Sequence, residues 1–165
     1  MRRFASLVSA IAGIILTTPA AASVSVLQVA EVMRSEGYSG EIIEDGDAIL
    51  IESDAAAPFE VRLIDCTPAA DPVDAYCDEI LLLAAFDAAD LTDAPDIKAL
   101  LNEWNASRLF GRAAITDSGE ILFDHPIAAA GGLSNTAIAE NLAWFDFALE
   151  EFLAWIIEAE PAPGV

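Results

Sequence analysis

The amino-acid sequence predicts an α+β domain in which a long C-terminal helix packs on an antiparallel sheet. Short apolar runs are separated by turn signals such as Asp45-Gly46-Asp47 and Asp117-Ser118-Gly119, a pattern typical of β-hairpins. Near the C-terminus, apolar residues instead recur every three or four positions from Ile138 to Ile156, which indicates a helix. The expected order of elements is α-β-β-β-β-α-β-β-α.

The first helix is expected over residues 26–36. Ser25 and Gln28 form a capping-box pattern at its start, and Gly37 ends it. Its apolar stripe consists of Val26, Val29, Ala30 and Met33. Four strands are expected to follow and to pair as one antiparallel sheet, over residues 38–44, 48–53, 59–65 and 78–86.

A second helix is expected over residues 95–107, because its apolar residues share one face. Asn102 and Asn105 lie three residues apart beside that face. Their amides could tie the helix end to the following strand, as structural groups, or they could bind a ligand. Arg112, in that strand, is expected to be exposed or to pair with nearby acids. Two strands are expected here, over residues 110–116 and 120–124.

The final helix begins after a cap at Ser134 and has two apolar faces. We expect the sheet to cover the first face, which consists of Ile138, Leu142, Phe145, Leu149, Phe152 and Ile156. Trp144 and Trp155 belong, with Ala148, to the second face. We expect both tryptophans to be partly exposed, as a homodimer contact or a partner-binding patch. The alternative is that the two earlier helices cover them. Residues 161–165 are expected to be a disordered tail.

The segment from Leu101 to Asp124 combines several short motifs. Asn102 and Asn105 flank a helix tryptophan, Gly111-Arg112 lies in a strand, and Gly119 ends a turn. Together with the long aromatic helix, these motifs resemble the YbjN family over roughly residues 26–157. The resemblance implies a fold similar to that of type III secretion chaperones and a role in sensory transduction. It implies no particular reaction.

The N-terminus is expected to be a signal peptide over residues 1–22. Arg2 and Arg3 form a basic start, residues 4–16 form an apolar core, and Ala20-Ala21-Ala22 offers a cleavage site. The apolar core is too short to span a bilayer comfortably. We therefore expect a single mature domain over residues 23–160, in the periplasm of a Gram-negative bacterium or secreted. The alternative is an uncleaved membrane anchor.

Cys66 and Cys77 are the only cysteines, and they flank a polar, proline-containing loop between two expected strands. Export would place both in oxidising conditions, where pairing is favoured. We therefore expect a disulfide that closes the base of the loop. The sequence holds no C-x-x-C redox motif, so a catalytic thiol is not expected.

The chain is strongly acidic, with a formal net charge of −21. This charge repels phosphate backbones and anionic membrane surfaces, so we expect neither nucleic-acid binding nor membrane binding after signal cleavage. It is compatible with basic partners, and equally with a purely solubilising role.

Residues suited to catalysis are sparse. His125 is the only histidine, and it lies at the end of an expected strand without triad or metal-ligand spacing, so we expect a solvated edge residue. Asp87, Asp90, Asp93 and Asp96 form an acidic cluster without the pattern of a calcium loop. Helix caps and solvation explain this cluster. No catalytic residue, metal or cofactor is therefore expected.

Two classes of function follow from the sequence. The favoured class is a non-enzymatic, chaperone-like regulatory module that binds a protein or peptide. Its candidate binding residues are Trp144, Trp155, Asn102, Asn105 and Arg112. The alternative is a cation-binding protein or an acid-dependent enzyme that uses the Asp87–Asp96 cluster.

Overall fold

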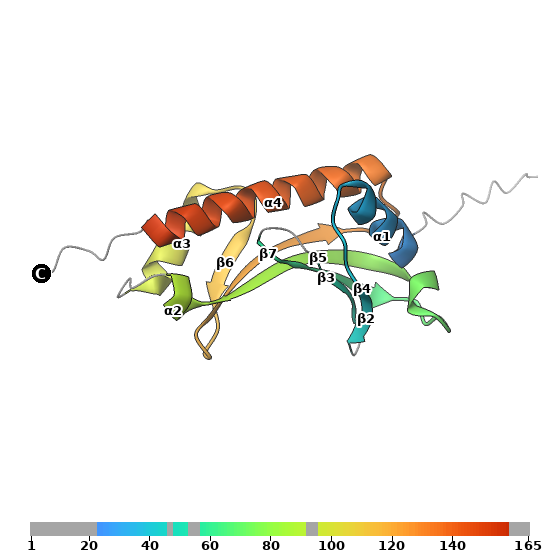
Figure 1. Cartoon of the computed structure of the whole chain (residues 1–165), viewed down its shortest axis with the longest axis horizontal. Helices are drawn as coiled ribbons and strands as arrows, with labels where there is room; N and C mark the ends of the chain where they lie inside the picture. The colour runs from blue at the N-terminus through green and yellow to red at the C-terminus, as the bar shows by residue number, and fades with distance from the viewer. Residues whose placement is uncertain (1–22, 46–47, 53–56, 92–95, 159–165) are drawn as a thin grey trace, which may run out of the picture.

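The computed structural model describes residues 23–45, 48–52, 57–91 and 96–158. The expected signal peptide and C-terminal tail lie outside the described residues. Figure 1 shows a long helix lying across one face of a curved sheet. The elements are β1 (Val24–Ser25), α1 (Val26–Ser35), β2 (Ile42–Asp45), β3 (Ala48–Glu52), β4 (Glu60–Cys66), η1 (Pro72–Asp74), β5 (Tyr76–Asp87), α2 (Ala88–Leu91), α3 (Ile97–Ser107), β6 (Arg112–Ile115), β7 (Glu120–Ala128) and α4 (Asn135–Glu158).

The sheet is antiparallel, with the strand order β2-β3-β4-β5-β7-β6 and β1 paired to β5. β5 and β7 form its longest pairing, which runs from Glu79 opposite Ala128 to Asp87 opposite Glu120. The predicted α+β class and element order are therefore confirmed. β1, the 3₁₀ turn η1 and the one-turn helix α2 are additions that carry too few residues for a periodic signal.

β7 continues to Ala128, beyond the end at Asp124 that we expected from the sequence. Pro126 favours a strand end there, because proline cannot donate to a sheet ladder. In the structure, Pro126 lies opposite Leu81 of β5, while the pairing with β6 stops at Asp124. Within the described residues, the β6 side of β7 therefore has no ladder partner at Pro126, and a proline fits there.

α4 buries the apolar face that the sequence predicted. Its stripe of Ile138, Leu142, Phe145, Leu149, Phe152 and Ile156 is at most 2% exposed. It packs on inward-facing strand residues, among them Val61, Leu63, Ile80, Leu82, Ile121 and Phe123. Each such side chain stabilises the fold by roughly 1.5–3 kcal/mol. Among the described residues, no helix combines the length and apolar character needed to span a bilayer.

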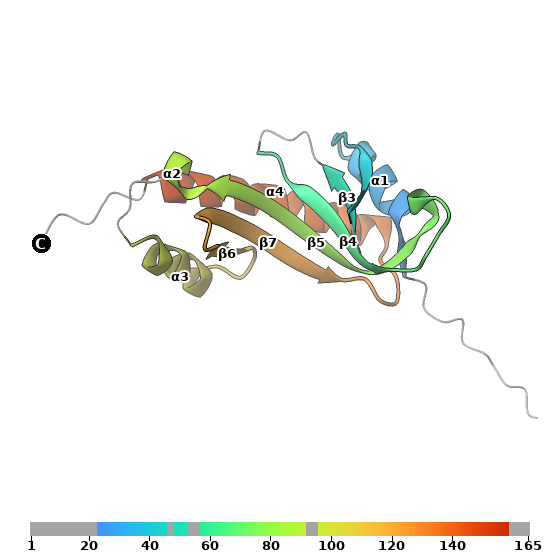
Figure 2. The ribbon, with the colours of Figure 1, turned by 90° about the horizontal axis from the view of Figure 1, so that it is seen from below.

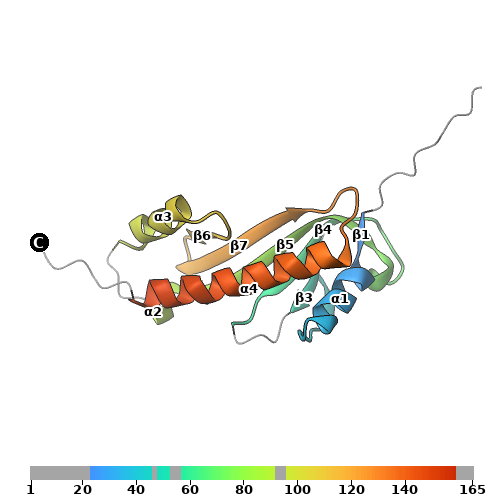
Figure 3. The ribbon, with the colours of Figure 1, turned by 90° about the horizontal axis from the view of Figure 1, so that it is seen from above.

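α1 and α3 lie on opposite sides of α4, as the view from above shows (Figure 3). Gln28 of α1 donates hydrogen bonds to the carbonyl oxygen of Leu133, at 2.8 Å, and to Oδ1 of Asn135, at 2.9 Å. These contacts hold α1 against the start of α4. Seen from below, the sheet lies in front of α4, with α3 at its β6 side (Figure 2).

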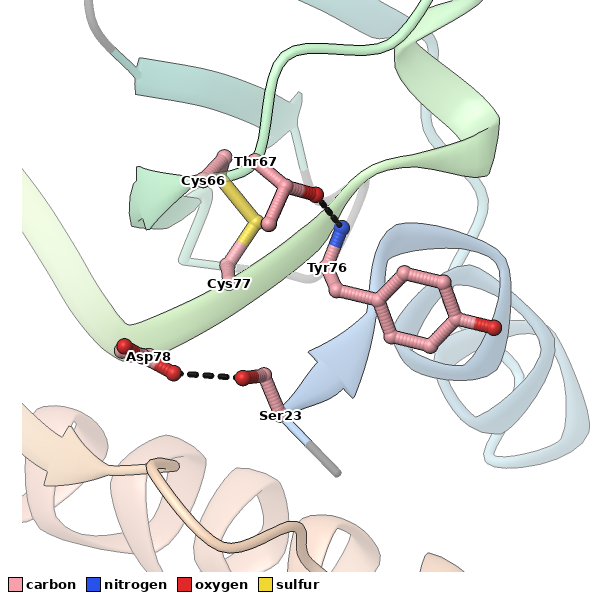
Figure 4. The surroundings of a disulfide bond; sticks show 6 residues. All are labelled: Ser23, Cys66, Thr67, Tyr76, Cys77 and Asp78. Atoms are coloured by element: carbon pink, nitrogen blue, oxygen red, sulfur yellow. Dashed lines mark hydrogen bonds between the residues drawn. A yellow bond between two sulfur atoms is a disulfide. The ribbon is translucent and has the colours of Figure 1, made fainter. Parts of the chain in front are cut away.

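The expected disulfide between Cys66 and Cys77 is present (Figure 4). The two residues lie opposite each other at the ends of β4 and β5, so the bridge closes the base of the loop. Beside it, the backbone N–H of Tyr76 donates to Oγ1 of Thr67 at 3.1 Å. Ser23 donates to Asp78 on the other side of β5 at 2.5 Å.

Candidate binding surface

The side of α4 that faces away from the sheet carries two large exposed aromatic residues. Trp144 is 59% exposed and Phe147 is 52% exposed. They lie three positions apart on the helix, with ring centroids 6.0 Å apart. With Glu140 and Ala143 they line an open hollow of about 380 Å³.

The loop between α3 and β6 extends this surface. Phe110 lies with its ring centroid 6.5 Å from that of Trp144. We call Phe110, Trp144 and Phe147 the aromatic patch. Trp144 and Phe147, two of its three members, are more than half exposed, which is unusual for large apolar side chains that lie close together on a protein surface.

Trp104 of α3 fixes the loop that carries Phe110. Its ring is 1% exposed, and its indole N–H donates to the carbonyl oxygen of Gly111 at 3.3 Å. Gly111 has a φ of +73°, and a Cβ there would lie 2.2 Å from Cζ of Phe123. Only glycine fits this position without displacing a buried ring. These two contacts hold in place the loop that carries Phe110.

His125 contacts the aromatic patch from strand β7 of the sheet. Alternation along β7 places it on the same side of the sheet as Ile121 and Phe123, and its ring stacks on Phe110 at 3.7 Å. The expectation of a solvated edge residue is therefore wrong, because β7 continues past His125 and α4 covers this side. Burial, and then the charge of Arg112, lower the pKa of His125.

Acid is expected to destabilise the protein partly through His125. Its pKa in the folded protein lies below the ordinary value of 6.5, so the unfolded chain binds this proton more readily. This contribution to stability is fully present above pH 6.5 and is lost as the pH falls through the lowered pKa. Between about pH 7 and about pH 5, the unfolding free energy of the wild type should fall more than that of His125→Gln. Urea unfolding at several pH values measures this, and equal falls would contradict it.

Asn105 is held in a structural contact. Its side-chain N–H donates to the carbonyl oxygen of Ala113 at 2.8 Å, and its Oδ1 accepts from the N–H of Ala113 at 2.9 Å. The amide thus takes the place of a further strand beside β6, the edge strand of the sheet. Asn102 is exposed and takes no part in this contact.

Arg112 forms an ion pair across the hairpin. Its guanidinium lies 2.7 Å from Oδ1 of Asp124, the residue opposite it in β7. The Arg112 side chain is 65% exposed, so the pair contributes little stability. The sequence offered an exposed strand residue or a partner for acids, and Arg112 is both.

The structure separates the two tryptophans that the sequence placed together. Trp155 is half-buried and packs on Trp104 at 5.4 Å and on Phe152 at 6.4 Å. Trp155 therefore keeps the partial exposure that we expected, but α3 packs against it through Trp104, as the alternative interpretation held for both tryptophans. Trp144 lies beyond the reach of α3 and stays exposed, so we exclude Trp155 from the aromatic patch.

The acidic cluster serves helix ends where it is described. Asp87 Oδ1 accepts from the N–H of Ala89 at 2.9 Å, and Asp96 Oδ1 accepts from the N–H of Ala99 at 3.0 Å. Asp93 lies outside the described residues. Within the described ranges, no group of three or more acidic, histidine or cysteine side chains is placed to hold a metal ion.

The family described as "YbjN: Putative bacterial sensory transduction regulator" has a model that matches residues 25–158. The chain belongs to the YbjN family. This confirms the resemblance that the motifs between Leu101 and Asp124 indicated. Trp104, Asn105 and Gly111, three residues of those motifs, all have structural roles in the described fold.

Two solved structures are similar to this YbjN domain. An uncharacterized protein from Methanothermobacter thermautotrophicus has a TM-score of 0.51 and 15% identity, covering 78% of this chain and 92% of the other. YbjN from E. coli has a TM-score of 0.42 and 19% identity, covering 78% and 86%. At its low identity, the first structure shows a shared fold alone. No curated protein sequence matches the chain.

Phe110 and Phe147 were not among the residues we expected from the sequence. Phe147 carried a usable signal, because it lies three positions after Trp144 on one helical face. Phe110 carried none, because its place beside α4 depends on how α3 and β6 pack together.

Proposed function

We propose that this YbjN-family domain is a non-enzymatic regulatory module that binds a protein or peptide segment on the aromatic patch. The exposure of Trp144 and Phe147 carries the proposal, since the opposite face of the same helix is fully buried. Exposed aromatic residues that cluster on a protein surface are the usual anchors of protein interfaces. The family description, a regulator, agrees with a binding role.

The domain is further proposed to act after export. The support is the basic, apolar and small-residue order of residues 1–22, together with the disulfide between Cys66 and Cys77, which oxidising compartments favour. N-terminal sequencing of the native protein should begin at Ser23. Recovery of an intact Met1 would contradict export with cleavage.

Truncation of the patch tests the binding role. Trp144→Ala combined with Phe147→Ala should weaken capture of immobilised random-sequence peptides by at least about tenfold, because aromatic anchors dominate interface energies. The matched control combines Leu27→Ala with Tyr76→Ala, which are 45% and 49% exposed elsewhere. The control should bind as the wild type does. Equal binding by wild type and the patch variant would overturn the proposal.

A further inference from the structure

The outer side of α4 carries acidic residues among its apolar ones. Five acidic residues and no lysine or arginine occur in the sequence of α4. Asp146 accepts a hydrogen bond from Tyr38 at 3.3 Å. The other four are exposed and lie at Glu140, Glu150, Glu151 and Glu158. The helix therefore presents an acidic surface that is also aromatic.

Two of these glutamates frame the aromatic pair. Glu140 precedes Trp144 by four positions, and Glu151 follows Phe147 by four positions, so each carboxylate lies one helical turn beyond a ring on the same side. Glu140 also lines the hollow beside both rings. A ligand whose apolar side chains filled the hollow would have a carboxylate at either end.

Within the described residues, these carboxylates form no salt bridge. The salt bridges there join Arg62 to Glu60 and Arg112 to Asp124, and neither involves α4. The electrostatic potential of the whole chain is also negative, because its formal net charge is −21. A positively charged ligand would be attracted before contact and paired after it.

We propose that the segment bound by the aromatic patch is cationic and amphipathic, with large apolar side chains that contact Trp144 and Phe147 and with lysine or arginine beside Glu140 and Glu151. This inference rests on the proposed binding function and adds the chemistry of the partner. A second copy of the chain fits less well, because two α4 surfaces would bring glutamates against glutamates.

Three synthetic peptides test the charge of the partner. They share one pattern of leucine at the spacing of an amphipathic helix and carry lysine, glutamine or glutamate at every other position. Fluorescence anisotropy with the purified protein should give the lysine peptide a Kd at least about tenfold below that of the glutamine peptide, and the glutamate peptide the weakest binding. Added salt should reduce the difference.

Charge-neutral variants separate a local effect from the overall charge. Glu140→Gln combined with Glu151→Gln should weaken the lysine peptide severalfold and leave the glutamine peptide unchanged. Glu103→Gln combined with Asp117→Asn removes the same charge from α3 and the β6–β7 turn, and should have little effect. Equal weakening by both pairs would reduce the attraction to net charge and overturn the local pairing.

The outcomes distinguish the two proposals. If the lysine and glutamine peptides bind equally, and both lose affinity in Trp144→Ala, the patch binds segments but the cationic partner is wrong. If the lysine peptide binds with the same affinity to the wild type and to the Trp144→Ala and Phe147→Ala variants, the aromatic patch is not the binding surface and the proposed function fails. If no peptide binds, the cationic partner is overturned, while the random-peptide experiment still decides the proposed function.

Discussion

Replacing Trp104 by alanine should lower the free energy of unfolding by about 3–5 kcal/mol. The indole is 1% exposed and contacts Phe123, Phe152 and Trp155, with ring centroids 6.0, 5.2 and 5.4 Å away. Alanine leaves a cavity where α3 meets the core and removes the hydrogen bond to Gly111. Thermal unfolding should show a drop in Tm of roughly 10–20 °C.

A second tryptophan provides the control for this experiment. Trp144→Ala removes the same side chain from a site that is 59% exposed, so its unfolding free energy should change by no more than about 0.5 kcal/mol. Trp104→Phe should fall between the two, because phenylalanine keeps part of the packing but leaves the Gly111 carbonyl without its donor. Similar losses for Trp104→Ala and Trp144→Ala would show that the core is not arranged around Trp104.

Loss of the disulfide is expected to cost about 3 kcal/mol, because the bridge limits the freedom of the unfolded chain over a short loop. Cys66 and Cys77 are separated by 11 positions. The pair also lies where β1 joins the sheet, with Val24 opposite Cys77. Cys66→Ser combined with Cys77→Ser should therefore lower Tm by roughly 10 °C.

The reductant response gives an independent check on the disulfide. Urea unfolding of the wild type should shift to lower urea when dithiothreitol is present, whereas the double serine variant should unfold at the same urea concentration in both conditions. A wild type that is insensitive to reductant, with a thiol titration of two per chain, would mean that the bridge is absent in the native protein.

Sequence periodicity predicted those parts of the fold that local signals determine. The α4 stripe from Ile138 to Ile156 repeats often enough for its buried face to be unambiguous, and the two cysteines marked the ends of β4 and β5. The extension of β7 past Pro126 was missed, because the effect of a proline depends on whether a neighbouring strand is present. The strand propensity of residues 120–128 does not reveal whether another strand lies beside Pro126.

The candidate site was predictable only where one element forms it. Trp144 was found because its helical position opposes the buried stripe. Trp155 has a similar local pattern, but α3 packs against it, and no feature of α4 itself reveals this. Phe110 joins Trp144 from a loop that Trp104 and Gly111 hold in place, so its role follows from tertiary packing.

The pairing of β5 with β7 also has a consequence for the order of folding. The sheet consists of one part that contains strands β1 to β5 and of the hairpin of β6 and β7. Nine residue pairs between β5 and β7 join these two parts. Hairpins form between strands that are close in sequence. The β5–β7 pairing instead closes a long loop between Asp87 and Glu120, and closing this loop costs conformational entropy. α4 packs across both parts (Figure 3) and follows them in the chain. The rate of folding should therefore depend on the β5–β7 pairing and on the docking of α4. A chain whose α4 segment is still held in the ribosome or the export channel cannot complete its core.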